Sequence, residues 1–337
     1  MSKPSKNTLA IYANASSERG FGHVMRQLAL IEYAKKQNQP VLIYCHEIVT
    51  QIHARLHALG VEVIKLNSIG VDDIPALPIL IIDDYQLKIA DYQILRDKVD
   101  TLVLFDDAVY SDLPRLDMVI NPSDVQLSQL HAKIKLQGVE YRLLREEFCV
   151  SYSRKKRTPH SVLICLGGSD VKMLSASLAQ VLLNDDRVAQ VHVLATDSMI
   201  EENLKALEAL RSHSKCKLYI NCQQVAPVMA SVEVAISTAG SSLYELMAIG
   251  VPTLALIVAD NQKQALLSEL NNKAYLSVDI RHTINSELLI LQKLFALIGN
   301  STLKQQLSSH AISSIDGCAA KRIVSAINNL RSENMYA

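Results

Sequence analysis

The chain of 337 residues contains no tryptophan and only four phenylalanines. This shortage removes the aromatic platform on which single-stranded nucleic acid usually stacks. Basic and acidic residues are equally numerous, at 34 each, so no overall basic field attracts nucleic acid or an anionic membrane. We therefore expect no nucleic-acid partner, although a small anionic ligand would need only a local site.

Long apolar runs and cysteine motifs are also missing. No stretch approaches the ~18 uninterrupted apolar residues that span a bilayer, so we expect no integral membrane segment. The first residues, Met1 to Asn7, are polar and lack the apolar core of a signal peptide. The six cysteines show neither Cys-x-x-Cys nor a zinc-like spacing. Together these absences predict a location in the reducing cytoplasm.

The sequence does not indicate a metal site either. His53 and His57 stand four residues apart on a predicted helix, but the glutamate of the zinc-protease motif does not lie between them. The dinucleotide pattern Gly-x-Gly-x-x-Gly is absent as well. We therefore expect no metal and no other cofactor, and the oligomeric state stays open.

Short apolar runs alternate with helical stretches along the chain, as is typical of parallel sheets covered by helices on both faces. The first two helices are expected at 22–37 and 48–59. The pattern pauses between about 122 and 160 and then restarts. The strands are expected at 8–13, 41–45, 61–66, 78–83, 101–106 and 118–121, and after the pause at 161–166, 190–195, 217–220, 232–237 and 253–257.

These two series predict two α/β domains, each with a doubly wound, Rossmann-type sheet. We assign residues 1–150 to the first domain and 160–315 to the second, with a linker at about 122–160. The segment 316–337 is expected to be a helix that packs back on the first domain. Because ligands bind at the C-terminal edge of such sheets, two facing domains would bind theirs in a shared cleft.

A glycine-rich segment follows the first expected strand and opens the first helix. It contains Gly20, Gly22, His23 and Arg26. Glycines let the backbone approach a ligand, and the free amides at a helix start favour anionic groups. His23 would lie in the first turn of the helix, at the ligand edge of the sheet. The alternative is an ordinary turn that happens to carry a histidine.

Carboxylates stand at the C-terminal ends of two strands that are predicted to be buried. Asp83, Asp84 and Tyr85 follow one strand, and Asp106 and Asp107 follow the next. These positions lie at the edge where sites form in this fold, so the side chains could orient a base or bind sugar hydroxyls. The alternative is that they only cap the following helices.

The second half of the sequence has three turns of small and polar residues after strands. Backbone amides and hydroxyls in such turns suit a diphosphate, and a carboxylate one helical turn further on could grip a ribose diol. The alternatives are tight turns capped by serine and, for the last turn, an ordinary loop. The three turns contain Gly167, Gly168 and Ser169, then Ser241, Ser242 and Glu245, then Asn261 and Gln262.

Taken in order, these segments resemble the UDP-2,4-diacetamido-2,4,6-trideoxy-β-L-altropyranose hydrolases of pseudaminic acid biosynthesis. The resemblance runs from about residue 9 to residue 274, and its most specific parts are Gly-x-Gly-His-x-x-Arg at 20–26 and Leu-Arg-Glu-Glu-Phe at 144–148. It implies membership of the GT-B glycosyltransferase superfamily. It also implies a UDP-activated amino sugar as ligand, with the sugar on the first domain and the UDP on the second.

The resemblance also implies roles for individual residues. His23 occupies the position of the family's catalytic histidine, which activates water to attack the anomeric carbon with inversion and loss of UDP. An imidazole suits this role because it titrates near neutral pH. Ser241 and Ser242, with Gly167, would face the diphosphate, and Glu245 would face the ribose.

Two positions differ from the family pattern, which usually has Asp in place of Asn14 and Asp-His-Tyr in place of Asp83-Asp84-Tyr85. The second difference replaces a possible hydrogen-bond donor with an acceptor in the sugar-side domain. Three functions stay open: a nucleotide-sugar hydrolase, a GT-B glycosyltransferase with a sugar or lipid hydroxyl as acceptor, and a non-catalytic nucleotide-sugar sensor. We favour the hydrolase, with the sugar and the glycan it serves undetermined.

Overall fold

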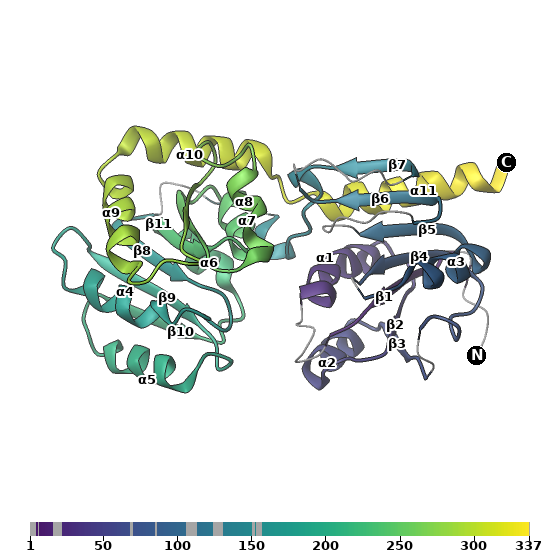
Figure 1. Cartoon of the computed structure of the whole chain (residues 1–337), viewed down its shortest axis with the longest axis horizontal. Helices are drawn as coiled ribbons and strands as arrows, with labels where there is room; N and C mark the ends of the chain where they lie inside the picture. Colours follow the sequence, from purple (N-terminus) through teal and green to yellow (C-terminus); the bar gives the residue numbers. More distant parts are fainter. Residues whose placement is uncertain are drawn as a thin grey trace. The chain divides into compact units, whose positions relative to one another are not determined.

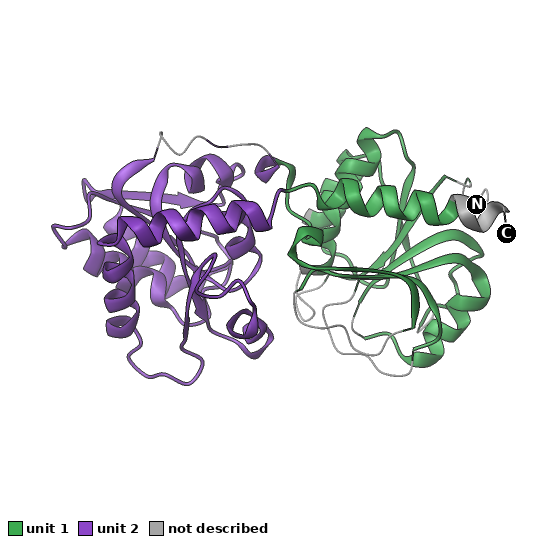
Figure 2. Ribbon diagram, turned by 90° about the horizontal axis from the view of Figure 1, so that it is seen from above, with its two compact units in different colours: residues 1–146, 317–337 green, residues 147–316 purple. Residues whose placement is uncertain are grey.

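The computed structural model describes residues 5, 7–15, 22–67, 70–84, 86–105, 113–123, 131–149, 152 and 157–336. The chain divides into two compact units (Figure 2). Unit 1 comprises Met1–Glu146 and Gly317–Ala337, and unit 2 comprises Glu147–Asp316. Unit 1 is therefore built from two separate pieces of the sequence, with unit 2 inserted between them.

Unit 1 contains a parallel sheet with the strand order β3-β2-β1-β4-β5-β6-β7 (Figure 1). Its strands are β1 (Leu9–Ala13), β2 (Val41–Cys45), β3 (Glu62–Lys65), β4 (Leu77–Asp83), β5 (Val99–Phe105), β6 (Leu116–Asn121) and β7 (Ala132–Gln137). Its helices are α1 (Gly22–Lys36), α2 (Thr50–Ala58), α3 (Ile89–Lys98) and α11 (Ala319–Tyr336), with short 3₁₀ turns at Val139–Tyr141 and Glu146–Phe148.

The central strands of unit 1 are apolar throughout because both faces of the sheet are covered. In β1, Leu9, Ile11 and Ala13 belong to the core on one side, and Ala10 and Tyr12 belong to the core on the other. Successive side chains of a strand point to opposite faces, so a strand buried on both faces needs an unbroken apolar run.

The C-terminal helix α11 completes the core of unit 1. It packs against α1, and its side chains Ile323, Ile327 and Leu330 are buried in the same cluster as the residues of β1. Their spacing of four and three residues places them on one face of the helix. Residues more than 300 positions apart in sequence thus share one hydrophobic core.

Unit 2 contains a second parallel sheet with the order β10-β9-β8-β11-β12-β13. Its strands are β8 (Thr158–Cys165), β9 (Gln190–Ala195), β10 (Cys216–Ile220), β11 (Val232–Thr238), β12 (Thr253–Ile257) and β13 (Leu276–Asp279). Its helices are α4 (Leu174–Leu183), α5 (Glu201–Leu210), α6 (Val225–Ala230), α7 (Ser241–Ala248), α8 (Gln264–Leu267), α9 (Glu287–Ile298) and α10 (Ser301–Ser314), with a 3₁₀ turn at Asp260–Gln262.

The predicted fold class of two doubly wound α/β sheets is confirmed. The region expected to be irregular nevertheless contains β7, in which exposed Lys133 and Lys135 alternate with half-buried neighbours. A strand at the edge of a sheet tolerates such charges, so it lacks the apolar run that marks a central strand. None of the described helices is long and apolar enough to cross a membrane.

The strand order reverses at one point in each sheet. In unit 1 the chain passes outward from β1 to β3 and then returns to place β4 on the other side of β1. In unit 2 the same reversal places β8 beside β11. Doubly wound sheets bind ligands outside the C-terminal ends of the strands at this switch point. The ends of β1 and β4, and of β8 and β11, are therefore the places to look for a site.

Candidate functional site

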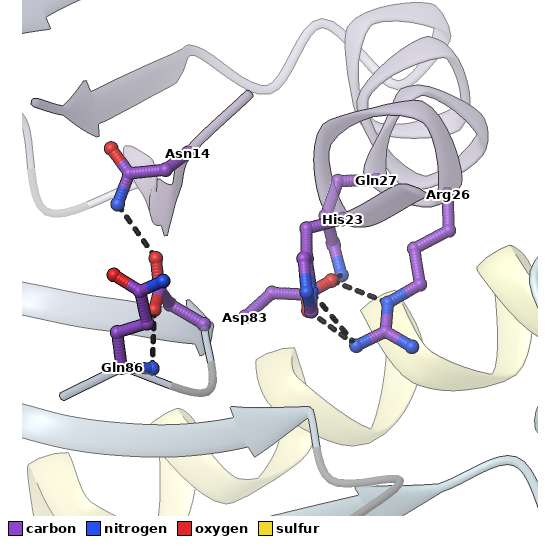
Figure 3. Close-up of polar contacts among 7 residues, drawn as sticks. Asn14, His23, Arg26, Gln27, Asp83 and Gln86 are labelled. Carbon is purple, nitrogen blue, oxygen red and sulfur yellow. Dashed lines mark hydrogen bonds and ion pairs between the residues drawn. The ribbon is translucent and has the colours of Figure 1, made fainter. Parts of the chain in front are cut away.

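The C-terminal end of β4 in unit 1 is occupied by Asp83, a fully buried carboxylate. Side chains of α1 donate hydrogen bonds to both of its oxygens (Figure 3). His23 Nδ1 lies 2.5 Å from Oδ1, Arg26 Nε lies 2.6 Å from Oδ2, and Gln27 Nε2 lies 2.7 Å from Oδ2. Arg26 Nη2 makes a further ion pair with Oδ1. One carboxylate thus holds three side chains of the first helix.

Helix geometry explains this convergence. His23, Arg26 and Gln27 stand at positions i, i+3 and i+4, so they share one face of α1. The guanidinium of Arg26 also lies over the ring of Phe105, 5.1 Å from its centroid, at the end of the neighbouring strand β5. Sequence reasoning did not include Gln27, although its spacing from His23 and Arg26 on the same helix is the signal that could have found it.

The charge of Asp83 sets which nitrogen of a neutral His23 ring carries the proton. Burial alone would raise the pKa of Asp83, but the Arg26 charge and the hydrogen bonds from Arg26 and His23 outweigh it and hold that pKa below its ordinary value. Asp83 is therefore an acceptor, so the neutral His23 ring carries its proton on Nδ1 and its lone pair on Nε2. A carboxylate that orients an imidazole in this way prepares Nε2 to act as a general base.

A second network lies beside the first, after β1. Asn14 is only 1% exposed. Its Nδ2 donates to Asp84 Oδ2 at 2.6 Å and to the Tyr12 hydroxyl at 3.2 Å. Its Oδ1 accepts from the backbone nitrogens of His46 and Glu47, at 2.7 and 3.1 Å. Asn14 thereby connects the loops that follow β1, β2 and β4.

The two positions that differ from the family pattern meet in this network. Asn14 and Asp84 are 70 residues apart in sequence, and the amide of the first donates to the carboxylate of the second. Asp84 also accepts from the backbone nitrogen of Gln86 at 2.7 Å, which closes the turn after β4. The two differences noted separately in the sequence are thus the two ends of a single contact.

In unit 2, the predicted glycine turn follows β8. Gly167 has a φ of +83°, and a Cβ placed on it would lie 3.7 Å from the Thr238 hydroxyl at the end of β11. The Gly168 carbonyl accepts from Thr196 Oγ1 at 2.6 Å, and Ser169 is exposed. The turns after β8 and β11 therefore lie side by side at the switch point.

Asp170, not Ser169, caps the helix that follows this turn. Its carboxylate accepts from the backbone nitrogens of Leu174 and Ser175 at 3.2 and 2.8 Å, and from Asn203 Nδ2 at 2.8 Å. The alternative of a capping serine is therefore wrong here, because Asp170, in the left-handed region (φ 40°), reaches the start of α4 instead. The cap leaves the Ser169 side chain at the surface.

The serine-rich turn after β11 also differs from the capping alternative. Helix α7 begins at Ser241, and its N-cap is Gly240, which has no side chain that could cap it. Ser241 is exposed, Ser242 is half-buried, and Glu245 is 8% exposed one turn further along. The start of a helix without a side-chain cap presents backbone amides, which suit an anionic group.

In the last predicted turn, Gln262 makes a hydrogen bond within the loop, whereas Asn261 is exposed. Gln262 Oε1 accepts from the Val258 backbone nitrogen at 2.9 Å, so it closes its own loop. Asn261 is exposed. Arg281 forms ion pairs with Asp260 at 2.5 Å and with Asp279 at 2.7 Å, and so fixes the ends of β12 and β13.

Several predicted residues are not part of a described site. Gly20, Tyr85 and Asp107 lie outside the described residues. Gly22 is the first residue of α1, and the histidines at 53 and 57 are both exposed on α2. Across the described stretches, no group of three His, Cys, Asp or Glu side chains is arranged to hold a metal ion.

The Leu-Arg-Glu-Glu-Phe segment, the second specific part of the resemblance, lies where the chain passes from unit 1 to unit 2. Glu146 forms an ion pair with Lys36 of α1. Glu147 Oε2 accepts from the Ala226 backbone nitrogen at 3.0 Å, at the start of α6. Phe148 is buried. These contacts anchor the chain in each unit at the point where it leaves one and enters the other.

Solved structures define the class of fold. MurG of Acinetobacter baumannii superposes with a TM-score of 0.67 at 14% sequence identity, over 96% of this chain and 99% of that one. HepE of Anabaena, solved with UDP and glucose, superposes with a TM-score of 0.58 at 12% identity, again over 96% and 99% of the two chains. The chain therefore has the GT-B fold.

Within that class, curated sequences confirm the resemblance indicated by the motifs. The UDP-2,4-diacetamido-2,4,6-trideoxy-beta-L-altropyranose hydrolase of Campylobacter jejuni is 25% identical, over 74% of this chain and 92% of its own length. The spore coat polysaccharide biosynthesis protein SpsG of Bacillus subtilis is 23% identical, over 97% and 99% of the two chains. The chain is similar to both proteins.

A third relative is longer than this chain. An uncharacterized protein of Methanocaldococcus jannaschii is 27% identical over 76% of this chain, and the match spans 57% of that protein's length. No protein-family model matches the chain.

Proposed function

We propose that the chain hydrolyses a UDP-activated diacetamido-trideoxyhexose and releases UDP with inversion at the anomeric carbon. The contact between His23 and Asp83 carries this proposal. It supplies an oriented imidazole at the switch point of unit 1, at the position of the catalytic histidine in the hydrolases that the sequence resembles. The similarity to the Campylobacter jejuni hydrolase supports the same reaction.

In the proposed step, His23 Nε2 removes a proton from water. The water oxygen forms a bond to the anomeric carbon, and the bond from that carbon to the diphosphate oxygen breaks with its electron pair leaving on UDP. Asp83 stabilises the positive charge that develops on the ring, because its carboxylate accepts the Nδ1 proton throughout. The free sugar and UDP leave, and the His23 proton returns to solvent.

Unit 2 is proposed to bind the UDP part. Gly167, Gly168 and Ser169 in one turn, and Ser241 and Ser242 in the adjacent turn, are placed at the switch point of its sheet, where amides suit a diphosphate. Glu245 would accept hydrogen bonds from the ribose hydroxyls. Arg26 and, in the last turn, Asn261 and Gln262 complete the proposed ligand-binding set, together with Gly20, Gly22, Tyr85 and Asp107. The carboxylates of Asp83 and Asp84 are engaged by contacts within unit 1.

A glycosyltransferase is the second candidate. The observation in its favour is the fold, since MurG and the HepE protein solved with UDP and glucose share it over almost the whole chain. In that reaction a sugar or lipid hydroxyl would replace water, and His23 would deprotonate the hydroxyl. A sensor that binds the nucleotide sugar without turnover is the third candidate. For each of them we expect a cytoplasmic protein of surface polysaccharide biosynthesis.

Product analysis in labelled water separates the three candidates. The purified protein would be incubated with a panel of UDP-diacetamido-trideoxyhexoses in H₂¹⁸O without an acceptor, and followed by ¹H and ³¹P NMR and mass spectrometry. UDP release with ¹⁸O on an inverted sugar supports the hydrolase. Release only after an acceptor hydroxyl is added supports the transferase. Tight binding with no release under any condition supports the sensor.

A further inference from the structure

Asn14 uses its whole hydrogen-bonding capacity inside the protein. A carboxamide has two N–H donors and two acceptor lone pairs. The donors go to Asp84 and the Tyr12 hydroxyl, and the acceptors take the backbone amides of His46 and Glu47. A side chain satisfied in this way and 1% exposed has nothing left to offer a ligand. Its role is to hold the loops after β1, β2 and β4 together.

Asp84 transmits this constraint to its neighbour Asp83. The two residues are adjacent, but their carboxylates have different partners. Asp83 contacts side chains of α1 (Figure 3). Asp84 contacts Asn14. Asp84 is 5% exposed, and its oxygens accept from Asn14 at 2.6 Å and from the Gln86 backbone nitrogen at 2.7 Å. These contacts fix the backbone at the point where β4 ends, and hence the direction of the Asp83 side chain.

We propose that Asn14 and Asp84 form a positioning pair that aims Asp83 at His23. This inference rests on the proposed function, because it assigns the pair to the same step. Neither residue touches the reacting atoms. The pair acts by holding the Asp83 carboxylate within hydrogen-bond distance of His23 Nδ1, and it would therefore affect turnover more than ligand binding.

The proposal is testable because Asn14 is the donor and Asp84 the acceptor of their hydrogen bond. Asn14→Asp places a second carboxylate against Asp84, and two carboxylates at this distance repel when both are charged. The turn after β4 should move. Because a displacement of about 1 Å at a reacting group can cost about a hundredfold in rate, we expect kcat to fall by roughly 10- to 100-fold. The Kd of UDP should stay within about twofold, since Asn14 lies in unit 1 and the UDP part is proposed to bind unit 2.

Reversing the pair should restore the contact. In the double variant Asn14→Asp with Asp84→Asn, the amide and the carboxylate exchange places. The carboxylate now at position 14 still accepts from the backbone amides of His46 and Glu47. The Tyr12 hydroxyl, which accepts from Asn14 in the wild type, now donates to it, and so does the amide now at position 84. We expect kcat to recover to within about threefold of the wild type. Asp84→Asn alone leaves a neutral acceptor for Asn14, so its loss of kcat should lie between those of the wild type and Asn14→Asp.

Unit 2 offers a matched control. Asn203 is also buried, and its Nδ2 donates to a buried carboxylate, Asp170, at 2.8 Å. Asn203→Asp therefore creates the same pair of opposed carboxylates, with a comparable loss of thermal stability, but in unit 2, whereas His23 belongs to unit 1. The ¹⁵N shifts of the His23 imidazole report its tautomer, and should change in Asn14→Asp and stay at wild-type values in Asn203→Asp.

The outcomes separate this inference from the proposed function. If the wild type releases no UDP, the proposed function fails, and the His23 spectrum still tests the positioning pair. A folded Asn14→Asp protein with wild-type kcat and an unchanged His23 spectrum would overturn the pair. So would a folded double variant no faster than Asn14→Asp. If Asn14→Asp does not fold, the kcat of the double variant is compared with that of Asp84→Asn alone. A lower kcat in the double variant overturns the positioning pair, and a higher kcat supports it.

Discussion

The two units build their candidate sites from different materials at the same place in the fold. At the switch point of unit 1, the buried side chains of Asp83 and Gln27 and the half-buried side chains of His23 and Arg26 are held together by hydrogen bonds. At that of unit 2, the two turns are rich in glycine and serine, and α7 begins after a glycine N-cap. A side-chain network suits proton transfer, whereas exposed backbone amides suit an anion.

A buried Asn–Asp contact occurs in both units and serves a different purpose in each. In unit 2, Asp170 accepts from Asn203 and caps the start of α4, so the contact stabilises a helix end. In unit 1, Asp84 accepts from Asn14 and closes a turn beside Asp83. The same chemical pair thus supports a helix in one unit and the direction of a candidate catalytic side chain in the other.

The largest expected effect tests whether proton transfer belongs to unit 1 and UDP binding to unit 2. His23→Ala removes the proposed base, so turnover should fall by roughly 10²- to 10⁴-fold. The Kd of UDP, measured by isothermal titration calorimetry, should stay within about twofold, because the nucleotide is assigned to unit 2. A His23→Ala protein with wild-type turnover would remove this side chain from the mechanism. Gln27→Leu, which removes one hydrogen bond to Asp83 and leaves His23, should give a smaller loss.

The units should also lose stability at different pH. His192 in β9 is 2% exposed, and burial, with a smaller effect of the Lys217 charge, lowers its pKa from 6.5 to about 4. The folded state therefore binds fewer protons than the unfolded state between these values. Unit 2 has its full stability above pH 6.5 and should lose up to about 3 kcal/mol as the pH falls to about 4.

Unit 1 should respond at lower pH. The pKa of Asp83 is below its ordinary value of 3.8, so its contribution is present above pH 3.8 and is lost as the pH falls further. Hydrogen-exchange mass spectrometry on peptides of each unit, after equilibration between pH 7 and 3, distinguishes the two ranges. His192→Gln should remove the pH dependence of unit 2 between 6.5 and 4. If both units lost their protection from hydrogen exchange over the same pH range, the predicted difference between them would be wrong.

A smaller effect tests the ribose contact. Glu245→Gln keeps the size of the side chain but removes its charge, so UDP should bind about tenfold more weakly, a loss near 1.4 kcal/mol. If Glu245 accepts from the ribose diol, the wild type should prefer UDP to 2′-deoxy-UDP, and the variant should lose that preference. Equal binding of both nucleotides by the wild type would show that the carboxylate does not contact the 2′-hydroxyl.

The smallest effect concerns two adjacent glycines. Gly167 has a positive φ that side chains disfavour, so Gly167→Ala should cost about 1 kcal/mol of stability and weaken UDP binding. Gly168→Ala is the control, since a Cβ there would meet Thr196 at an ordinary 3.7 Å and the backbone needs no left-handed conformation. Thermal unfolding of the two variants compares them. Equal losses would mean that backbone conformation is not what requires glycine at 167.

The apolar strands were predictable because burial on both faces leaves a plain pattern, as in β4 and β5. The edge strand β7 was not, since Lys133 and Lys135 break its apolar pattern. Individual site residues such as His23 and Asp83 could be proposed from their positions after strands. Their contact could not, because 60 residues separate them and only the packing of α1 beside β4 brings them together.

The placement of α11 has a consequence for synthesis on the ribosome. Unit 2 is encoded without interruption and can complete its sheet and helices as soon as residue 316 has emerged. Unit 1 begins before unit 2 but is completed after it, since Ile323, Ile327 and Leu330, which fill its core, follow unit 2 in the sequence. Until then, the apolar face of α1 lacks its partner. A nascent chain would therefore carry a complete unit 2 together with an incomplete unit 1, whose uncovered apolar surface would be prone to aggregation.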